Sequence, residues 1–256
     1  MNFLLTLAYD GTNYCGFQVQ PNGRSVAAVF QDALEAVLGT RPDIKGCSRT
    51  DAGVHAACQV ASFHAPKRPT DEVLGQLRRL LPEDIGALTL DYAPERFHAR
   101  LSAVEKTYVY RLWNSDRPDV FARRYRAWEP RQLDCDAMRA GAAGLVGTHD
   151  FFTFCANRQM KKSTVRTIYD IEIEQKEQRL VLSFTGNGFL YQMVRILTGT
   201  LIEVGEGKRS PMEMEEILAA ENREAEWAKL DAFTRGSNIS AADYHLVRLD
   251  MLKAMG

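Results

Sequence analysis

The sequence predicts an α+β or mixed α/β fold built from two halves of similar element order. Segments with apolar residues at every second position alternate with longer segments of helical spacing, and this order recurs in the second half. No Gly/Ser-rich or Pro-rich linker separates the halves near residues 100–105, which fits a single sheet shared by both. A chain of 256 residues is long enough to bury a substantial core in one large or two moderate domains.

The first half opens with a strand at residues 3–9, where Leu5 and Leu7 set the alternation. Ser25 can cap a helix that runs to Leu38 with apolar residues at helical spacing, and Gly39 closes it. The other elements expected here are a loop around Asp51, a strand at 59–63 and a helix capped by Thr70.

The second half opens with a strand at residues 106–113, on which Tyr108 and Tyr110 share one face. The segment 189–204 reads as a helix that is apolar nearly all round, and such helices are usually buried. The other elements expected here are a helix at 134–145, strands at 165–174 and 180–185, and a helix that begins at Pro211.

Several functional classes are disfavoured by composition. No apolar run approaches the roughly 18–20 residues that span a bilayer, and the N-terminus lacks the basic region of a signal peptide, so we expect a cytoplasmic protein. The five cysteines are odd in number and lack C-x-x-C spacing, and the five histidines lack ligand spacing. We therefore expect neither a disulfide framework nor a metal site.

The charge distribution permits contact with nucleic acid without demanding it. A net charge of −1 argues weakly against phosphate binding, although a local basic patch can still provide it. The basic clusters are Lys67-Arg68, Arg78-Arg79, Arg123-Arg124-Tyr125-Arg126 and Lys161-Lys162, and acidic residues gather at 213–216 and 221–226. Most such runs are solvated faces, but together they allow a dipolar surface.

The segment from Ser48 to His55 is the most informative stretch of the chain. It places Asp51 close to Arg49 and just before a glycine, which can present one carboxylate on a tight loop near a cation. An ordinary turn is the simpler interpretation, because Asp beside Gly is common in turns. His55 invites a role as general base, but a lone histidine near such a loop is more often structural.

Two further residues have open interpretations. Arg195 lies within the apolar helical segment, where its guanidinium needs either an anionic partner or a route to solvent along its own stem. Tyr108 can pack in the core or, if exposed in a cleft, stack on a nucleobase.

Taken together, the motifs resemble the tRNA pseudouridine synthase A family. The segment 48–55 resembles the signature of that family, and the run from Gly186 to Arg195 is close to a second hallmark. Further blocks keep the family's order over roughly residues 3 to 208: Tyr9–Thr12, Gly16–Gln18, Arg24–Val26, Leu81–Ile85, Phe97–Arg100, Lys106–Arg111, Gly147–Phe151 and Val165–Ile168.

The resemblance implies a role for each site residue. Asp51 matches the catalytic nucleophile, Tyr108 the tyrosine that stacks on the base, and Arg195 the arginine that pairs with the catalytic carboxylate. Arg49 matches the arginine that helps to hold the extruded nucleotide. The carboxylate could attack C1′ of the sugar, add to C6 of the ring, or remove a sugar proton to give a glycal. No redox step or group carrier is needed, so no cofactor is expected.

The resemblance also implies an architecture and a substrate. We expect two related α/β halves, 1–102 with the Asp51 loop and 103–256 with Tyr108 and Arg195, sharing one mostly antiparallel sheet around an active-site cleft. The expected protein is a homodimer that binds the anticodon arm of tRNA and isomerises uridines 38, 39 and 40, without membrane association.

Some features depart from the family pattern and leave alternatives open. Segment 237–247 lacks an expected glycine and carries Asp243 and His245, and Arg78-Arg79 replaces small polar residues, so the uridine preference could be shifted. A non-catalytic RNA-binding or RNA-folding protein on the same scaffold is one alternative. A glycosidase-like hydrolase ranks last, since that chemistry normally uses two carboxylates and the Asp51 motif has one.

Overall fold

The computed structural model describes residues 1–157, 159–220 and 243–246. The chain divides into two compact units, Met1–Lys106 with the chain from Tyr244 onward, and Thr107–Asp243. Each unit combines helices with its own mostly antiparallel strand pairs, and the predicted α+β class is confirmed. The predicted shared sheet, the cleft and the division at residues 102–103 stay predictions.

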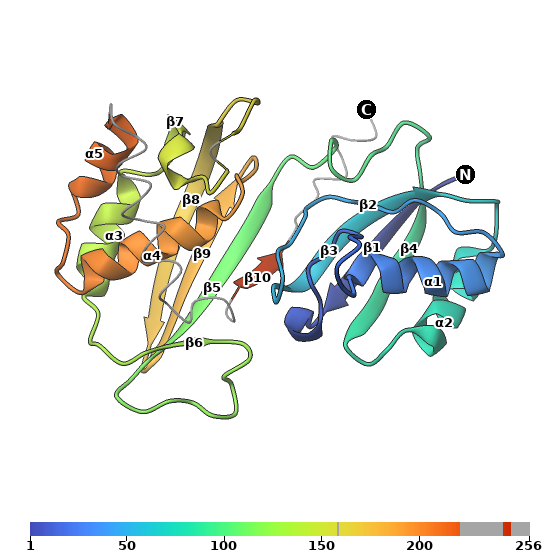
Figure 1. Ribbon diagram of the computed structural model, residues 1–256, viewed down its shortest axis with the longest axis horizontal. Coiled ribbons are helices and arrows are strands. Elements are labelled where there is room, and N and C mark those ends of the chain that lie inside the picture. Colours follow the sequence, from blue (N-terminus) through green and yellow to red (C-terminus); the bar gives the residue numbers. More distant parts are fainter. Residues whose placement is uncertain (158, 221–242, 247–256) are drawn as a thin grey trace. The chain divides into compact units, whose positions relative to one another are not determined.

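The first unit is a twisted sheet with two helices on one face (Figure 1). β1 lies between β3 and β4 and is antiparallel to both, while β2 and β10 pair with β3. The elements are β1 (Asn2–Tyr9), a 3₁₀ turn (Gly11–Asn13), α1 (Val26–Leu38), β2 (Lys45–Gly46), β3 (His55–His64), α2 (Thr70–Leu80), β4 (Ile85–Ala93) and β10 (Asp243–Leu246).

Both faces of β1 are covered, which explains why this strand anchors the unit. Phe3, Leu5 and Leu7 join the main core of the unit, together with apolar residues of α1 and α2. Leu4 belongs to a smaller cluster with Phe97 and other residues. A strand buried on both sides has little freedom to slip, because a shift of one residue would exchange the two sets of side chains.

The helix ends of this unit test two capping predictions. The Ser25 hydroxyl accepts the Ala28 N–H at 3.3 Å, and Gly39 ends α1 with a left-handed φ of 72°, so both predicted ends of α1 are confirmed. The predicted cap at Thr70 is wrong: Thr70 is the first residue of α2, and Pro69 holds the cap position without a side-chain hydrogen bond.

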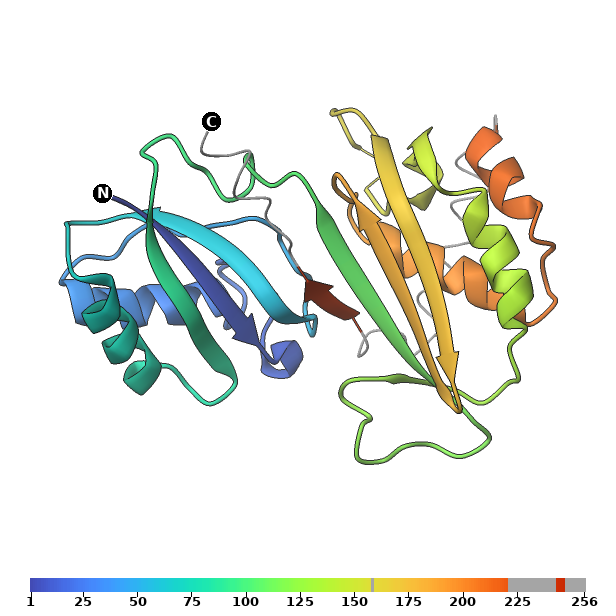
Figure 2. The ribbon, with the colours of Figure 1, turned by 180° about the vertical axis from the view of Figure 1, so that it is seen from behind.

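The second unit is a sheet whose helices also lie on one face, as both ribbon views show (Figures 1 and 2). β8 pairs antiparallel with β7 and β9, β5 lies beside β9, and β6 pairs parallel with β5. The elements are β5 (Lys106–Asn114), β6 (Ala127–Glu129), α3 (Cys135–Ala143), β7 (Gly147–Asp150), a 3₁₀ turn (Phe152–Phe154), β8 (Val165–Lys176), β9 (Arg179–Gly186), α4 (Met193–Gly205) and α5 (Glu213–Ala219).

The central helix of this unit begins later than the sequence predicts. The sequence predicts a helix over 189–204, whereas α4 runs from Met193 to Gly205. Gln192 has a left-handed φ of 56°, and that conformation cannot continue into a right-handed helix. Buried residues occupy most of α4, as its all-round apolar pattern predicts. Within the described residues, no helix is long and apolar enough to cross a bilayer.

The unusual segment at residues 237–247 lies outside the described residues, except for the backbone of β10. That strand runs parallel to β3, with Tyr244 opposite His55. The expected effect of Asp243 and His245 on uridine preference stays a prediction.

Candidate active site

Asp51 lies on the loop between β2 and β3, in the first unit. The Val54 N–H donates to the Asp51 carbonyl at 3.2 Å, and Gly53 takes a φ of 79°. This is a tight turn in which glycine supplies the left-handed residue. The turn interpretation and the presentation of Asp51 are therefore compatible, because the turn leaves the Asp51 residue only half-buried.

Buried hydrogen bonds brace the residues just before Asp51. The hydroxyls of Tyr9 and Thr50 lie 2.7 Å apart, and the Thr50 carbonyl accepts the Phe17 N–H at 3.1 Å. The Gln59 amide, fully buried, donates to the Ser48 carbonyl at 2.8 Å. These partners come from β1, from the segment before α1 and from β3. The backbone on the N-terminal side of Asp51 is therefore fixed by three separate parts of the unit.

Two glycines allow the segment after β1 to approach the Asp51 loop closely. A Cβ on Gly16 would lie 2.7 Å from the Thr50 carbonyl oxygen, and Gly16 also has a φ of 109°. A Cβ on Gly11 would lie 2.0 Å from the Val54 carbonyl oxygen. Only glycine fits at such distances from backbone atoms. The family-like opening of the sequence thus serves to hold the Asp51 loop.

His55 is structural in its surroundings, which agrees with the interpretation from sequence. Its ring is buried, and Nδ1 lies 3.0 Å from an Asp10 carboxylate oxygen and 3.2 Å from the Gly11 nitrogen. One tautomer cannot serve both neighbours, because Nδ1 either donates to Asp10 or accepts from Gly11. In either form the ring ties the end of β1 to the start of β3.

Tyr14 also supports the Asp51 loop. Its carbonyl accepts the Gly53 N–H at 3.2 Å, and its hydroxyl donates to the Asp84 carboxylate at 2.5 Å. Burial, followed by this hydrogen bond, raises the pKa of Tyr14 well above its usual range. The phenol therefore stays protonated and keeps its bond to Asp84.

Cys47, four residues before Asp51 in the sequence, is not a reactive group. Burial raises the pKa of the Cys47 thiol to about 11, and the thiol donates to the Gln59 side-chain oxygen at 3.4 Å. The Lys106 ammonium donates to the Cys47 carbonyl at 2.7 Å. Since the thiolate is the nucleophilic form, Cys47 is inert at neutral pH.

Arg49 differs from its neighbours in being exposed. Its guanidinium donates to the Gln18 side-chain oxygen at 3.3 Å, a weak contact that leaves the group able to reorient. Within the described residues, no group of three or more His, Cys, Asp or Glu side chains is placed to hold a metal ion.

The two tyrosines of β5 have different environments. Tyr110 is fully buried in the core of the second unit. Tyr108 is half-buried and packs edge-to-face against Phe189, with ring centroids 5.1 Å apart. Of this pair, Tyr108 is thus the one with ring surface left for a substrate base, and Phe189 fixes its orientation.

Arg195 lies in the first turn of α4 and is half-buried between the buried residues Val194 and Ile196. A cation at this end meets the positive pole of the helix dipole, which costs about 0.3–1 kcal/mol. An anion close to Arg195 would offset that cost, in line with the expectation from sequence.

Asp51 and Arg49 belong to the first unit, and Tyr108 and Arg195 belong to the second. The pairing of Asp51 with Arg195 stays a prediction. Sequence reasoning missed Tyr9, Thr50 and Gln59 as supports of the loop. Tyr9 stood in a family-like block, whereas nothing in the sequence marked Gln59 as more than a polar residue in a strand.

Comparison with known proteins decides the family. The profile of the tRNA pseudouridine synthase family matches residues 6–101 and 142–242. The chain belongs to this family. It is 42% identical over 219 residues to the tRNA pseudouridine synthase A of Geobacillus kaustophilus, covering 85% of each chain. The enzyme of the same name from Halalkalibacterium halodurans is 44% identical over 223 residues, which is 86% of this chain and 85% of the relative.

A third pseudouridine synthase A, from Bacillus pumilus, is 43% identical over 88% of this chain and 92% of its own. Among solved structures, the archaeal box H/ACA sRNP Nop10–Cbf5 complex aligns with 98% of this chain and 60% of that chain, at 14% identity and a TM-score of 0.38. A score that low supports no conclusion about this synthase-family chain.

Proposed function

We propose that this protein is an isomerase that converts uridines 38, 39 and 40 in the anticodon arm of tRNA to pseudouridine, with Asp51 as nucleophile. Membership of the synthase family carries the proposal for the reaction. The support for Asp51 is the braced turn that holds its backbone while the residue stays only half-buried. Such preorganisation matters because a small displacement of a reacting group can cost a large part of the rate.

The reaction is an isomerisation that balances without a co-reactant. The C1′–N1 glycosidic bond breaks, uracil turns within the site, and C5 bonds to C1′. The proton on C5 is lost to water, and N1 gains a proton, so no atom or electron is added overall. No cofactor is therefore required.

Each role open to Asp51 needs an ionised carboxylate. It can attack C1′, add to C6 of the uracil, or remove a sugar proton to give a glycal. A nearby guanidinium favours the charged form of a carboxylate and fixes its direction. Arg195 is the residue we assign to this task.

The remaining site residues handle the base and its neighbours. Tyr108 stacks on the uracil and keeps the detached ring in place, since aromatic stacking is the common way of holding an unpaired base. The exposed Arg49 takes the space left by the extruded nucleotide. Extrusion costs a few kcal/mol, which contacts of this kind offset.

We also assign the protein to the cytoplasm and to a homodimeric assembly. The homodimer follows from the family resemblance of the sequence, and a cytoplasmic location fits an enzyme that acts on tRNA. Neither is needed for the chemistry at Asp51.

The test is tritium release from tRNA labelled at uridine C5. Wild type is compared with Asp51→Asn, at enzyme concentrations adjusted to equal RNA occupancy. Asp91→Asn is the matched control, because it makes the same change at an exposed position of β4 in the same unit. We expect release by wild type and Asp91→Asn, and none by Asp51→Asn.

Two outcomes would contradict the proposal. If wild type binds tRNA without releasing tritium, the non-catalytic RNA-binding alternative replaces it. If Asp51→Asn releases tritium at the wild-type rate, another group is the nucleophile.

A further inference from the structure

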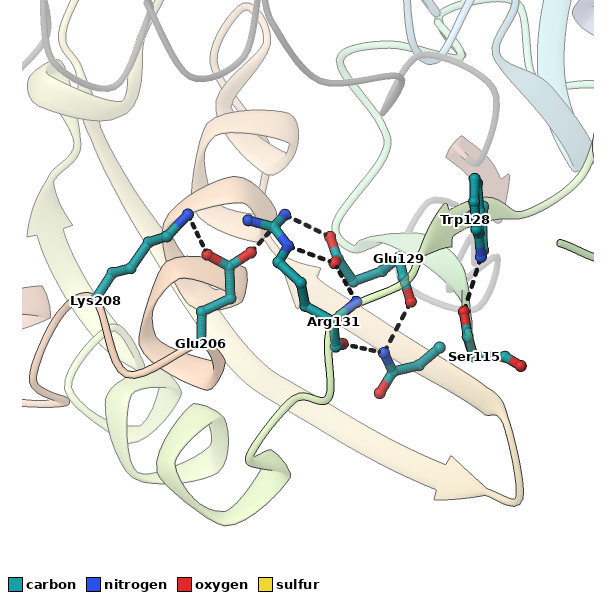
Figure 3. A network of polar contacts seen from close by, with 7 residues as sticks. Ser115, Trp128, Glu129, Arg131, Glu206 and Lys208 are labelled. Carbon is teal, nitrogen blue, oxygen red and sulfur yellow. Dashed lines mark hydrogen bonds and ion pairs between the residues drawn. The ribbon is translucent and has the colours of Figure 1, made fainter. Parts of the chain in front are cut away.

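The loop of residues 115–126, between β5 and β6, extends from the sheet of the second unit (Figure 1). Its base is clamped by polar contacts (Figure 3). The Trp128 indole N–H donates to the Ser115 carbonyl at 2.8 Å, and the Asn114 amide donates to the carbonyls of Glu129 at 3.0 Å and Arg131 at 2.6 Å. Both ends of loop 115–126 are therefore tied to one another.

The clamp is itself anchored to the helical layer. The Arg131 guanidinium bridges Glu129 and Glu206, and Lys208 also contacts the Glu206 carboxylate (Figure 3). The Glu206 side chain is only 3% exposed and follows directly on α4. A buried carboxylate offsets its desolvation cost only when its cationic partner stays at close distance and in good orientation. The base of the loop is thus rigidly joined to α4.

The interior of loop 115–126 is also built around one residue. The Asp119 carboxylate accepts the N–H groups of Phe121 at 3.2 Å and Ala122 at 3.1 Å, and pairs with Arg126 at 3.1 Å. The Arg126 guanidinium lies over the Trp113 ring, 5.8 Å from its centroid. These contacts preform the backbone that carries Phe121.

What this loop presents to solvent is unusual for a structural turn. The Phe121 side chain is 93% exposed, its neighbour Val120 is 55% exposed, and Arg123 and Arg124 are exposed beside them. Over residues 115–126 there are four arginines and two aspartates, in a chain of net charge −1. A preformed loop that exposes Phe121 almost fully among cations adds nothing with this side chain to the core of its own unit.

We propose that loop 115–126 is a second RNA-contacting element, in which Phe121 stacks on an unpaired base and Arg123 and Arg124 contact the adjoining phosphates. It rests on the proposed function, because it names a further contact with the same RNA substrate. Seven residues of extended chain separate Tyr108 from Ser115, roughly 23 Å at the rise of a β-strand. The loop therefore contacts a nucleotide other than the reacting one, and it acts in binding.

RNA fits this surface better than a second copy of the chain does. A two-fold interface uses the same patch on both subunits. If this loop lay near the axis, its arginines would face the same arginines of the second subunit, and the like charges would repel. Protein interfaces also deplete charge at their centre. Single-stranded RNA supplies phosphates for the arginines and a base for the ring, with no apolar area needed around Phe121.

The experiment measures the dissociation constant of the full chain for a fluorescently labelled tRNA transcript at several salt concentrations. The variants are Phe121→Ala, Phe121→Trp and Arg123→Gln/Arg124→Gln. Arg179→Gln is the control, because it removes one exposed arginine from the β8–β9 turn of the same unit. Thermal melts check that each variant is folded, and light scattering gives the particle mass.

We expect Phe121→Ala to weaken binding by roughly 5- to 150-fold, the range measured for base stacking, and Phe121→Trp to restore it. In the double arginine variant, the slope of log affinity against log salt concentration (the salt slope) should fall in magnitude by about one for each phosphate that is no longer neutralised. Arg179→Gln should match wild type. Particle mass should be unchanged.

Three results would overturn the inference. In the first, the Phe121→Ala and double arginine variants bind tRNA with the same affinity and the same salt slope as wild type. The second is a fall in particle mass in Phe121→Ala, which would make the loop a contact between copies of the chain. In the third, Arg179→Gln weakens binding as much as the loop variants do. A wild type that binds tRNA without releasing tritium would instead refute only the proposed catalysis.

Discussion

Replacing Tyr9 by phenylalanine tests whether the brace behind Asp51 positions the carboxylate. The change removes one hydroxyl from a buried pair and leaves Thr50 without the partner that lies 2.7 Å away. Both residues are 5% exposed, so water cannot replace the missing bond. Leaving such a group unsatisfied costs about 1–3 kcal/mol of stability. For a chain of this size, that lowers the melting temperature by roughly 2–4 °C per kcal/mol.

The effect on catalysis should exceed the effect on binding. Thr50 directly precedes Asp51, so a looser Thr50 lets the carboxylate move, and a displacement of about 1 Å can cost as much as 10²-fold in rate. We expect a lower kcat for tritium release with an almost unchanged KM. Tyr92→Phe is the control, because its exposed hydroxyl donates to the Arg68 carbonyl in the same unit.

A double-mutant cycle isolates the pair. Thr50→Val is combined with Tyr9→Phe, and the two changes should couple by about 0.5–1.5 kcal/mol in unfolding free energy. Coupling near zero, or a Tyr9→Phe variant whose kcat equals that of Tyr92→Phe, would refute the role of this hydrogen bond in placing Asp51.

Two further changes probe the same unit. Gly11→Ala should abolish soluble folded protein or lower its melting temperature sharply, since the new Cβ would meet the Val54 carbonyl at 2.0 Å, whereas Gly75→Ala within α2 meets nothing within 4 Å and should stabilise by about 0.5–1 kcal/mol. Equal melting temperatures for both would contradict the close approach. Stability should also fall at alkaline pH. The pKa of Cys47 is about 11 in the folded chain against an ordinary value of 9.0, so the stability that its neutral thiol contributes is complete below pH 9 and is lost as pH rises toward 11. Between pH 9 and 10, urea titrations should therefore show that the free energy of unfolding falls by about 1 kcal/mol less in Cys47→Ser than in wild type. Equal falls in the two proteins would refute the raised pKa.

Local chemistry explains which elements could be predicted from the sequence. The ends of α1 were predictable, because a serine cap and a left-handed glycine act within one turn of the helix. β4 escaped prediction, since its register against β1 shifts between Thr6 and Leu7 and breaks the alternation of its buried residues. The start of α4 was misplaced because propensity alone does not reveal a left-handed Gln192.

The candidate site shows the same limit. Asp51 could be singled out because its motif is contiguous. Its supports could not, since Tyr9 and Gln59 reach the loop through sheet pairing and tertiary contact. Such contacts leave no periodic trace in a single sequence. Tyr108 could be named only by resemblance, and its half-exposed ring beside the buried Tyr110 supplies the physical reason for preferring it.

The bracing of the Asp51 loop has a consequence for protein engineering. An octapeptide spanning residues 48–55, cut from the chain or inserted into another scaffold, would lack the hydrogen bonds that set its backbone. A transferable unit must also carry the segment from Tyr9 to Phe17, with its two close-packed glycines, and a strand that offers the Gln59 amide. The smallest portable form of this loop therefore joins two stretches of chain, residues 9–17 and 48–64, which are separated by α1 in the sequence.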